Sequence, residues 1–523
     1  MPGLAIGHGH GGVRGEEQTP RSPMFEGRFG RMFRRLSPAT FSEQALHGLA
    51  TLMIAEAEAE PTPETEVDNE ENQGIAAGFT YLGQFIDHDL TFDPASSLMK
   101  RNDPNALVDF RNPQFDLDNI YGRGPDDQPY LYEADGRHLQ LGRPLTGNPT
   151  DRHTRDVPRH ASETGGPQPR ARALIGDPRN DENVIISQLQ ATLLRFHNKL
   201  ADEHTGKSFA DVQQLVRWHY QWVVLHDFLV TIVGKEMVHS ILPHLKSGRS
   251  VFDDPPRLLF YRWRNNPFIP VEFSVAAYRF GHSMVRPIYR LNTTLGADPP
   301  PANDPVNERQ LIFHPDDDAK SLNGFRAFPS IWAIEWNLFF DMGDHLPNVG
   351  VKRLQRAYKI DTSLVNPLGR LPTSFGFPED RRSLAERNLL RGLRMGLPSG
   401  QDVARAMGAP VIDDDHLKVG KATEESQATN PRLVDIKDFG REFIGKAPLW
   451  FYVLAEAQQQ FKKDDTPIRL GPVGGRIVAE TFIGLLLADP HSFLSQSPEW
   501  TPNNNRAFTM ADLIRKATSQ LMS

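Results

Sequence analysis

Apolar side chains recur at helical spacing through the middle of the chain, and this pattern predicts most of the regular structure. Five of them step by three or four positions and would share one helical face: Ile186, Leu189, Leu193, Phe196 and Leu200. Residues 209–232 predict a second, more apolar helix, and residues 273–286 predict a third, which Pro287 would close. Residues 382–395 and 476–488 predict two more helices. Strand signals are few and short, so we expect a mainly α fold built as a single large helical domain.

Polar segments divide the chain. Residues 1–71 read as an N-terminal arm, partly flexible, because a basic Gly- and Arg-rich stretch is followed by eight acids within residues 56–71. We therefore expect the compact domain to cover residues 72–523, starting near Asn72. Residues 123–178 are rich in Gly, Pro, Asp and Arg, and they predict a long surface excursion with a hairpin around residues 130–141.

The amino-acid composition argues against several classes of function. The 523 residues carry a formal net charge of −8, which argues against a general nucleic-acid binder or a protein of anionic membranes. Cysteine is absent, which excludes disulfides, thiolate metal sites and cysteine nucleophiles and makes a monomer the default expectation. No apolar run reaches the length of a membrane span, and residues 1–35 lack the apolar core of a signal peptide. The sequence is compatible with a cytoplasmic protein or with one secreted by a non-classical route.

Three separate segments concentrate residues that can carry chemistry. In residues 83–89 (GQFIDHD), His88 stands between two carboxylates in an apolar run, where polar groups must be paired or serve a site. A capped helix end or a plain Asp/His metal site would also explain it. Residues 112–122 (NPQFDLDNIYG) alternate oxygen donors of the kind Ca²⁺ prefers, although a surface turn has the same composition.

The third segment, residues 176–182 (GDPRNDE), runs into the first strong helix. It places Arg179 and Glu182 at a helix start, where Glu182 suits a capping or first-turn position. In isolation Arg179 reads as a surface guanidinium. Further on, His282 lies in an apolar stretch and follows Gly281, whose missing side chain would let a flat group approach.

Taken together and in this order, these motifs resemble the animal-type haem peroxidases of the peroxidase–cyclooxygenase superfamily, in a form typical of bacteria and similar to the myeloperoxidase and lactoperoxidase group. The resemblance runs from about residue 72 to about residue 493. Five segments carry it: the distal haem motif at residues 84–89, the calcium loop at 116–122, the catalytic-arginine helix at 179–182 with 194–200, the proximal helix at 278–282, and its support at 387–392 with 397–400.

The resemblance implies a haem peroxidase domain that reduces hydrogen peroxide while oxidising phenols, iodide, thiocyanate or bromide. It assigns His88 as the distal base, since a neutral imidazole near pH 7 can accept and return a proton. Arg179 would stabilise charge on the departing oxygen, and Gln84 would lie near the halide site. His282 would be the proximal iron ligand, with Asn388 accepting a hydrogen bond from its other ring nitrogen.

Further positions follow from the same resemblance. Asp87 and Glu182 match the acids that form ester bonds to a haem b derivative, and Arg279 is a cofactor-binding position of the proximal helix. Asn183 stands where a methionine makes a sulfonium link in myeloperoxidase, so no such link is expected. The resemblance implies five Ca²⁺ ligands. Asp89 comes from the distal motif, and the other four come from the loop: Asn112, Gln114 through its carbonyl, Asp116 and Asp118.

Two other functions remain open. A fatty-acid dioxygenase of the same superfamily would need a tyrosine three residues before the proximal histidine, but Arg279 holds that position and Tyr278 is about 100° further round a helix. A non-catalytic haem-binding protein would be expected to have lost His88, Arg179 or His282, and all three are present. His197, Asn198 and His219 are interpreted as structural residues.

Overall fold

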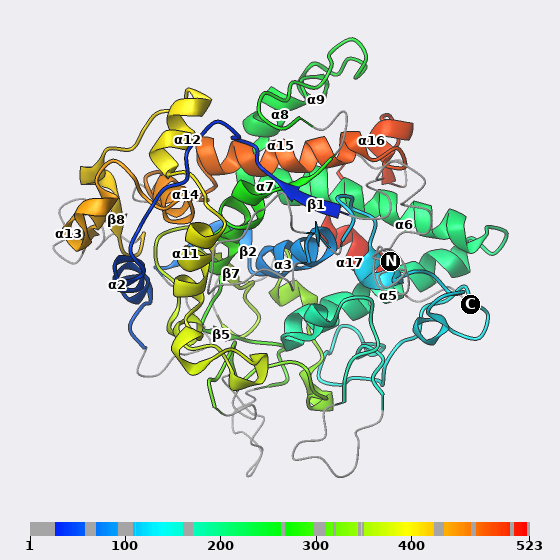
Figure 1. The fold of residues 1–523 in the computed structure, drawn as a ribbon. Coiled ribbons are helices and arrows are strands. Elements are labelled where there is room, and N and C mark those ends of the chain that lie inside the picture. The colour runs from blue at the N-terminus through cyan, green and yellow to red at the C-terminus, as the bar shows by residue number, and fades with distance from the viewer. Residues whose placement is uncertain are drawn as a thin grey trace, which may run out of the picture.

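The computed structural model describes most of the chain and is a largely helical body (Figure 1). The described residues are 27–57, 69–92, 108–109, 111–160, 171–262, 267–295, 310–316, 321–343, 347, 350–422, 433–461, 467–502 and 507–519. None of the described helices is long and apolar enough to cross a membrane.

Helices supply most of the regular structure. In chain order they are α2 (Glu43–Met53), α3 (Gly78–Leu90), α4 (Asp118–Tyr121), α5 (Val184–Glu203), α6 (Phe209–Val223), α7 (Val230–Val233), α8 (Lys235–Ile241), α9 (His244–Ser247), α10 (Val271–Ser274), α11 (Leu384–Arg394), α12 (Gly400–Met407), α13 (Ile436–Phe439), α14 (Leu449–Gln458), α15 (Pro472–Ala488), α16 (Phe493–Gln496) and α17 (Met510–Thr518). A π-helical turn, Val224–Leu229, joins α6 to α7. The mainly α prediction is confirmed, and α5, α6 with α7, α11 and α15 correspond to four of the predicted helices.

The strands are short and form four small sheets. They are β1 (Gly27–Gly30), β2 (Glu71–Ala76), β3 (Val108–Asp109), β4 (Ile269–Pro270), β5 (Ile288–Tyr289), β6 (Gln310–Leu311), β7 (Arg356–Tyr358), β8 (Lys418–Val419) and β9 (Val434–Asp435). β1 pairs antiparallel with β3 and parallel with β4, and three antiparallel pairs join β2 to β7, β5 to β6, and β8 to β9. The sheets join segments that are distant in the sequence, and strand residues such as Ile75 and Ile269 add to the mainly helical core.

The predicted third helix is wrong as a continuous element. α10 ends at Ser274, Ala276 has φ −128° and ψ −76°, and a 3-10 helix, η5 (Ala277–His282), follows. The Tyr278 ring stacks on Phe273 with ring centroids 4.7 Å apart, although an α-helix would separate residues five positions apart onto different faces. The Tyr278 hydroxyl also donates to the Gly83 carbonyl of α3 at 3.1 Å, so a tertiary contact as well as local stacking accompanies the break in the helix.

The expected domain start near Asn72 is also wrong for the described part of the N-terminal segment. Residues 27–57 pack into the core: Leu46 and Leu49 of α2 are fully buried, and α2 lies against α11. Glu272 accepts hydrogen bonds from the backbone N–H groups of Met32 and Phe33, each at 3.0 Å. Residues 1–26 and 58–68 of the predicted arm lie outside the described residues.

The surface excursion contains the predicted hairpin. Tyr132 bridges Leu139 in antiparallel fashion, and the backbone N–H of Glu133 donates to the carbonyl of His138 at 2.8 Å. His197 contacts the Tyr121 hydroxyl at 2.9 Å, and the side chain of Asn198 bonds both backbone groups of Leu139. The structural interpretation of His197 and Asn198 is therefore confirmed, as is the burial of His219.

Helix α3 lies near the middle of the body, with α15 running above it in Figure 1 and α5 and α17 to one side. It packs on α5 and on η5, and η5 in turn packs on α14 and α15. Gly78 begins α3 where a Cβ would come within 2.6 Å of the Phe339 carbonyl, so only glycine allows this close approach. The segments singled out in the sequence thus converge on the centre of the fold.

Candidate functional site

Helix α3 presents His88 inside the protein. The residue is 4% exposed, and its Nδ1 lies 2.6 Å from Asn180 Oδ1. The other ring nitrogen, Nε2, lies 4.0 Å from Glu182 Oε2. Burial, aided by the positive charge of Arg179, lowers the pKa of His88 to about 4. The imidazole is therefore neutral at pH 7 and able to take up a proton.

Arg179 is held rigidly beside α3. It lies on a 3-10 helix, η3 (Pro178–Asp181), and its Nη2 donates to the carbonyls of His88 at 3.1 Å and Thr91 at 2.5 Å. Nη2 and Nε also donate to the Asp177 carboxylate. Nη1 has no hydrogen-bond partner among the described residues, which leaves it for a substrate. The expectation of a surface guanidinium is wrong, because Asp177 and two carbonyls of α3 draw this group inward.

Glu182 and Gln84 lie next to His88. Gln84 Nε2 donates to Glu182 Oε2 at 2.9 Å, and Asn183 Nδ2 donates to Gln84 Oε1 at 3.3 Å. Burial raises the pKa of Glu182 to about 7. The predicted capping role falls to Asn183, whose side chain accepts from the N–H groups of Ile185 and Ile186 at the start of α5. Glu182 precedes the cap and is left for other contacts.

His282 ends η5 on the other side of the site. Its Nδ1 lies 2.7 Å from Asn388 Nδ2 on α11, so the predicted pair is in contact. A half-turn of the Asn388 amide exchanges its N and O, so that Oδ1 can accept from Nδ1–H at the same place. Burial, with a contribution from Arg279, lowers the pKa of His282 to about 3. His282 is therefore a second neutral imidazole.

Direct contacts join the two elements that carry the histidines. The Tyr278 hydroxyl donates to the Gly83 carbonyl of α3 at 3.1 Å. Asp87 Oδ2 lies 3.8 Å from Arg279 Nη1, and Asp87 Oδ1 accepts from Thr91 Oγ1 at 3.2 Å. The predicted distal and proximal motifs, far apart in the sequence, thus meet at one place.

The surroundings of His282 suit a flat anionic cofactor. A Cβ built on Gly281 would meet nothing within 4 Å, so there is open space at the residue that precedes His282. Burial and repulsion from Arg391 and Arg279 lower the pKa of Arg387 to about 10. The positive charges of Arg279 and Arg391 thus act against that of Arg387, and this concentration of charge favours a ligand with acidic groups, such as the propionates of haem.

Arg387 and Arg391 belong to the motif seen in the sequence, but neither was predicted as a site residue. Their spacing of four positions, on the helix that carries Asn388, is the signal that would have found them, since it places both on one face.

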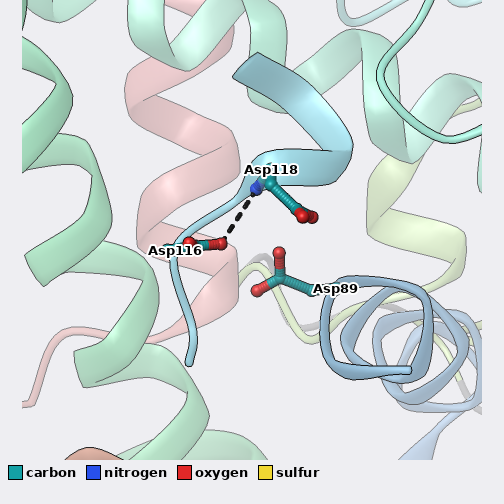
Figure 2. Close-up of side chains that lie close together, drawn as sticks. All are labelled: Asp89, Asp116 and Asp118. Carbon is teal, nitrogen blue, oxygen red and sulfur yellow. Dashed lines mark hydrogen bonds between the residues drawn. The ribbon is translucent and has the colours of Figure 1, made fainter. Parts of the chain in front are cut away.

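Three carboxylates form a candidate cation site beside His88. Oxygens of Asp89, Asp116 and Asp118 all lie within 4.8 Å of one another, and Figure 2 shows them pointing toward a common space from α3, a loop and the start of α4. Neither oxygen of Asp89 has a hydrogen-bond partner among the described residues. Burial raises the pKa of Asp89 well above its usual range, and the neighbouring carboxylates add to the effect. The Asp89 oxygens, together with the neighbouring carboxylates of Asp116 and Asp118, fit a hard cation such as Ca²⁺.

The remaining loop residues lie around this cluster. Asn112 Nδ2 donates to Asp116 Oδ2 at 3.2 Å, and the backbone N–H of Asp118 donates to Asp116 Oδ1 at 3.2 Å. Gln114 is buried beside them, and its N–H donates to the Asn112 carbonyl at 2.8 Å. Arg111 Nη1 contacts Asp118 Oδ2 at 3.0 Å and balances part of the negative charge.

Comparisons with known proteins find similarity to the animal haem peroxidases. A family model for the animal haem peroxidases matches residues 100–329. The chain is 27% identical over 250 residues to chorion peroxidase of Drosophila melanogaster, which is 45% of this chain and 26% of that protein. It is 26% identical over 217 residues to human myeloperoxidase, 38% of this chain and 26% of that protein. The chain thus spans about a quarter of the length of these curated relatives.

Solved structures share the fold at low identity. Peroxidase A from Dictyostelium discoideum matches with a TM-score of 0.62 and 16% identity over 96% of this chain and 95% of that chain. A fatty acid alpha-dioxygenase of Arabidopsis thaliana matches with a TM-score of 0.52 and 14% identity over 92% of this chain and 76% of that chain. These two structures establish the architecture and leave the choice of reaction to the site residues.

Proposed function

Since the chain belongs to the animal-type haem peroxidase superfamily, we propose that it is a haem-dependent peroxidase. It would reduce hydrogen peroxide and oxidise small donors such as phenols, iodide, thiocyanate or bromide. One observation carries the proposal: a neutral buried imidazole, His88, lies beside the fixed guanidinium of Arg179, on elements in direct contact with the one that bears His282.

The proximal residues would hold the cofactor. His282 would ligate the iron, Asn388 would orient its ring, and Arg279, Arg387 and Arg391 would face the acidic groups of the haem. When bound, haem supplies an iron centre that takes oxidising equivalents from peroxide. A neutral amide at Asn388 gives the imidazole less anionic character than a carboxylate would.

The distal residues would manage protons and charge. His88 Nε2 would accept a proton from hydrogen peroxide and donate it to the departing oxygen as water forms. Arg179 would place Nη1 toward that oxygen, because Asp177 and two carbonyls already hold its other nitrogens. Gln84, which contacts Glu182, would contribute a polar amide beside the halide.

The carboxylate cluster is proposed as a Ca²⁺ site. Asp89, Asp116 and Asp118 would supply carboxylate oxygens, and Asn112 and Gln114 would complete the ligand set from the same loop. Asp89 follows His88 on α3, so a bound cation would restrain the turn of helix that positions the imidazole.

A visible spectrum of the protein produced with ample haem tests the proposed function. We expect a Soret band that shifts on addition of hydrogen peroxide and returns with iodide or a phenol. A protein without any Soret band would show that His282 is an ordinary core histidine. A Soret band that no donor restores would favour a non-catalytic haem-binding protein.

The same sample distinguishes the dioxygenase alternative. Oxygen uptake with linoleate or arachidonate, abolished in a Tyr278→Phe variant, would replace peroxidase by oxygenase chemistry. We expect none, because Arg279 occupies the position of the radical-forming tyrosine and the Tyr278 hydroxyl donates to the Gly83 carbonyl.

Asp87 and Glu182 give a separate prediction about the haem linkage. If each carboxylate forms an ester with a haem methyl group, Asp87→Val and Glu182→Gln should each release one linkage. Mass spectrometry of the digested holoprotein measures the remaining bond, and Glu203→Gln at the far end of α5 serves as the control. Haem that acidified solvent extracts from the wild-type protein after peroxide treatment would refute the esters.

A further inference from the structure

Three buried amide side chains connect His88 back to its own helix. His88 Nδ1 lies 2.6 Å from Asn180 Oδ1, and Asn180 Nδ2 donates to Gln190 Oε1 at 2.8 Å. Gln190 Nε2 donates to the backbone carbonyl of Asn119 at 3.2 Å, and Asn119 Nδ2 donates to the Phe85 carbonyl of α3 at 3.3 Å. Asn119, Asn180 and Gln190 are fully buried. This amide relay (Asn119, Gln190 and Asn180) leaves α3 at Phe85 and returns to it at His88.

The backbone carbonyl of Asn119 fixes the direction of the bonds from Gln190 to His88. The Asn119 carbonyl can only accept, so Gln190 must turn its amide nitrogen toward it and its oxygen toward Asn180. Asn180 must then present its nitrogen to Gln190 and its oxygen to His88. An oxygen facing Nδ1 requires a hydrogen on that nitrogen, because two acceptors in contact would repel.

We infer that Asn180 and Gln190 are positioning residues that hold His88 as the Nδ1–H tautomer, with the lone pair of Nε2 free to accept a proton. This inference rests on the proposed function, since it concerns the base of that reaction. The opposite tautomer would carry its hydrogen on Nε2 and could take no proton from peroxide. The relay therefore selects the one neutral form of His88 that can act as a base.

Two substitutions of Asn180 separate positioning from packing. Asn180→Leu keeps the volume and removes the acceptor, whereas Asn180→Asp, with its carboxyl proton on the oxygen that faces Gln190 Oε1, keeps an oxygen facing Nδ1. If Asn180 only fills space, leucine should be tolerated at least as well as a buried acid. If it fixes the tautomer, aspartate should recover most of what leucine loses.

Gln190→Leu tests the next link in the relay. Gln188→Leu is its matched control, because Gln188 lies on the same helix, is equally buried and bonds Trp332 and Ile334 instead.

The readout is the association rate of cyanide with the haem-loaded protein, since hydrogen cyanide must give its proton to a distal base as the anion binds. We expect Asn180→Leu and Gln190→Leu to lower this rate by roughly tenfold or more, and Asn180→Asp and Gln188→Leu to stay within about threefold of wild type. Equal rates for Asn180→Leu and Asn180→Asp, or equal losses in Gln188→Leu and Gln190→Leu, would overturn the inference.

Nitrogen NMR of histidine-labelled full-length protein without haem reads the tautomer directly, with His88→Gln used to assign the signal. A protonated Nδ1 in the wild type supports the relay, and a protonated Nε2 refutes it. A wild type that shows the expected tautomer but oxidises no donor would refute the proposed function while the relay stands.

Discussion

Replacing His88 by alanine is expected to slow the reaction of the haem-loaded protein with hydrogen peroxide by about two to four powers of ten. The substitution removes the only neutral base next to Arg179 among the described residues. Hydrogen peroxide would then have to transfer its proton to water. Glu182 is a poorer substitute, since its carboxyl contacts Gln84 and lies 4.0 Å from the imidazole nitrogen it would replace. Stopped-flow absorbance of the Soret band measures the rate.

A buried histidine outside the site supplies the control. His244 is 8% exposed and has a lowered pKa because of burial, yet it lies on α9, away from the segments that form the site. His244→Ala should leave the peroxide rate unchanged. An unchanged rate in His88→Ala would remove His88 from the mechanism, whereas a slow rate in both variants would point to a general loss of packing.

The distal half of the site could be predicted from the sequence because its chemistry is concentrated in short segments. Gln84, Asp87, His88 and Asp89 occupy less than two turns of α3, so a helical backbone keeps them together. Helix α3 itself was not predicted. It is largely buried, and its polar residues Gln84, Asp87 and His88 belong to the site, so they were interpreted as chemistry and not as the solvent-facing side of a helix.

Contacts between distant segments could not be predicted in the same way. Gln190 looks like any polar residue of an amphipathic helix, and only the fold places it between Asn180 and Asn119. The break at Ala276 has a similar origin, since the stacking of Tyr278 on Phe273 and its bond to Gly83 decide the local backbone. Spacing along the chain describes one element at a time, and these features depend on two or more.

Removal of the cation from the carboxylate cluster is expected to destabilise the protein, and more strongly as pH rises. Without a cation, burial raises the pKa of Asp118 from its ordinary 3.8 to about 7, despite the opposing charge of Arg111. The folded chain then binds this proton more tightly than the unfolded chain. The contribution of Asp118 to the stability of the metal-free protein is therefore full below about pH 4 and is lost as pH rises through about 7.

A bound Ca²⁺ would take the place of that proton and keep the carboxylates ionised. The difference in Tm between the calcium-loaded and the chelated protein should accordingly be small near pH 5 and large near pH 8. Asp118→Asn should reduce this difference, while Asp253→Asn, an exposed acid outside the cluster, should preserve it. A chelator effect of the same size at both pH values would contradict a cation held by buried carboxylates.

Because Asp89 neighbours His88, the chelated protein should also react more slowly with peroxide, which would link the cation to the position of the distal base.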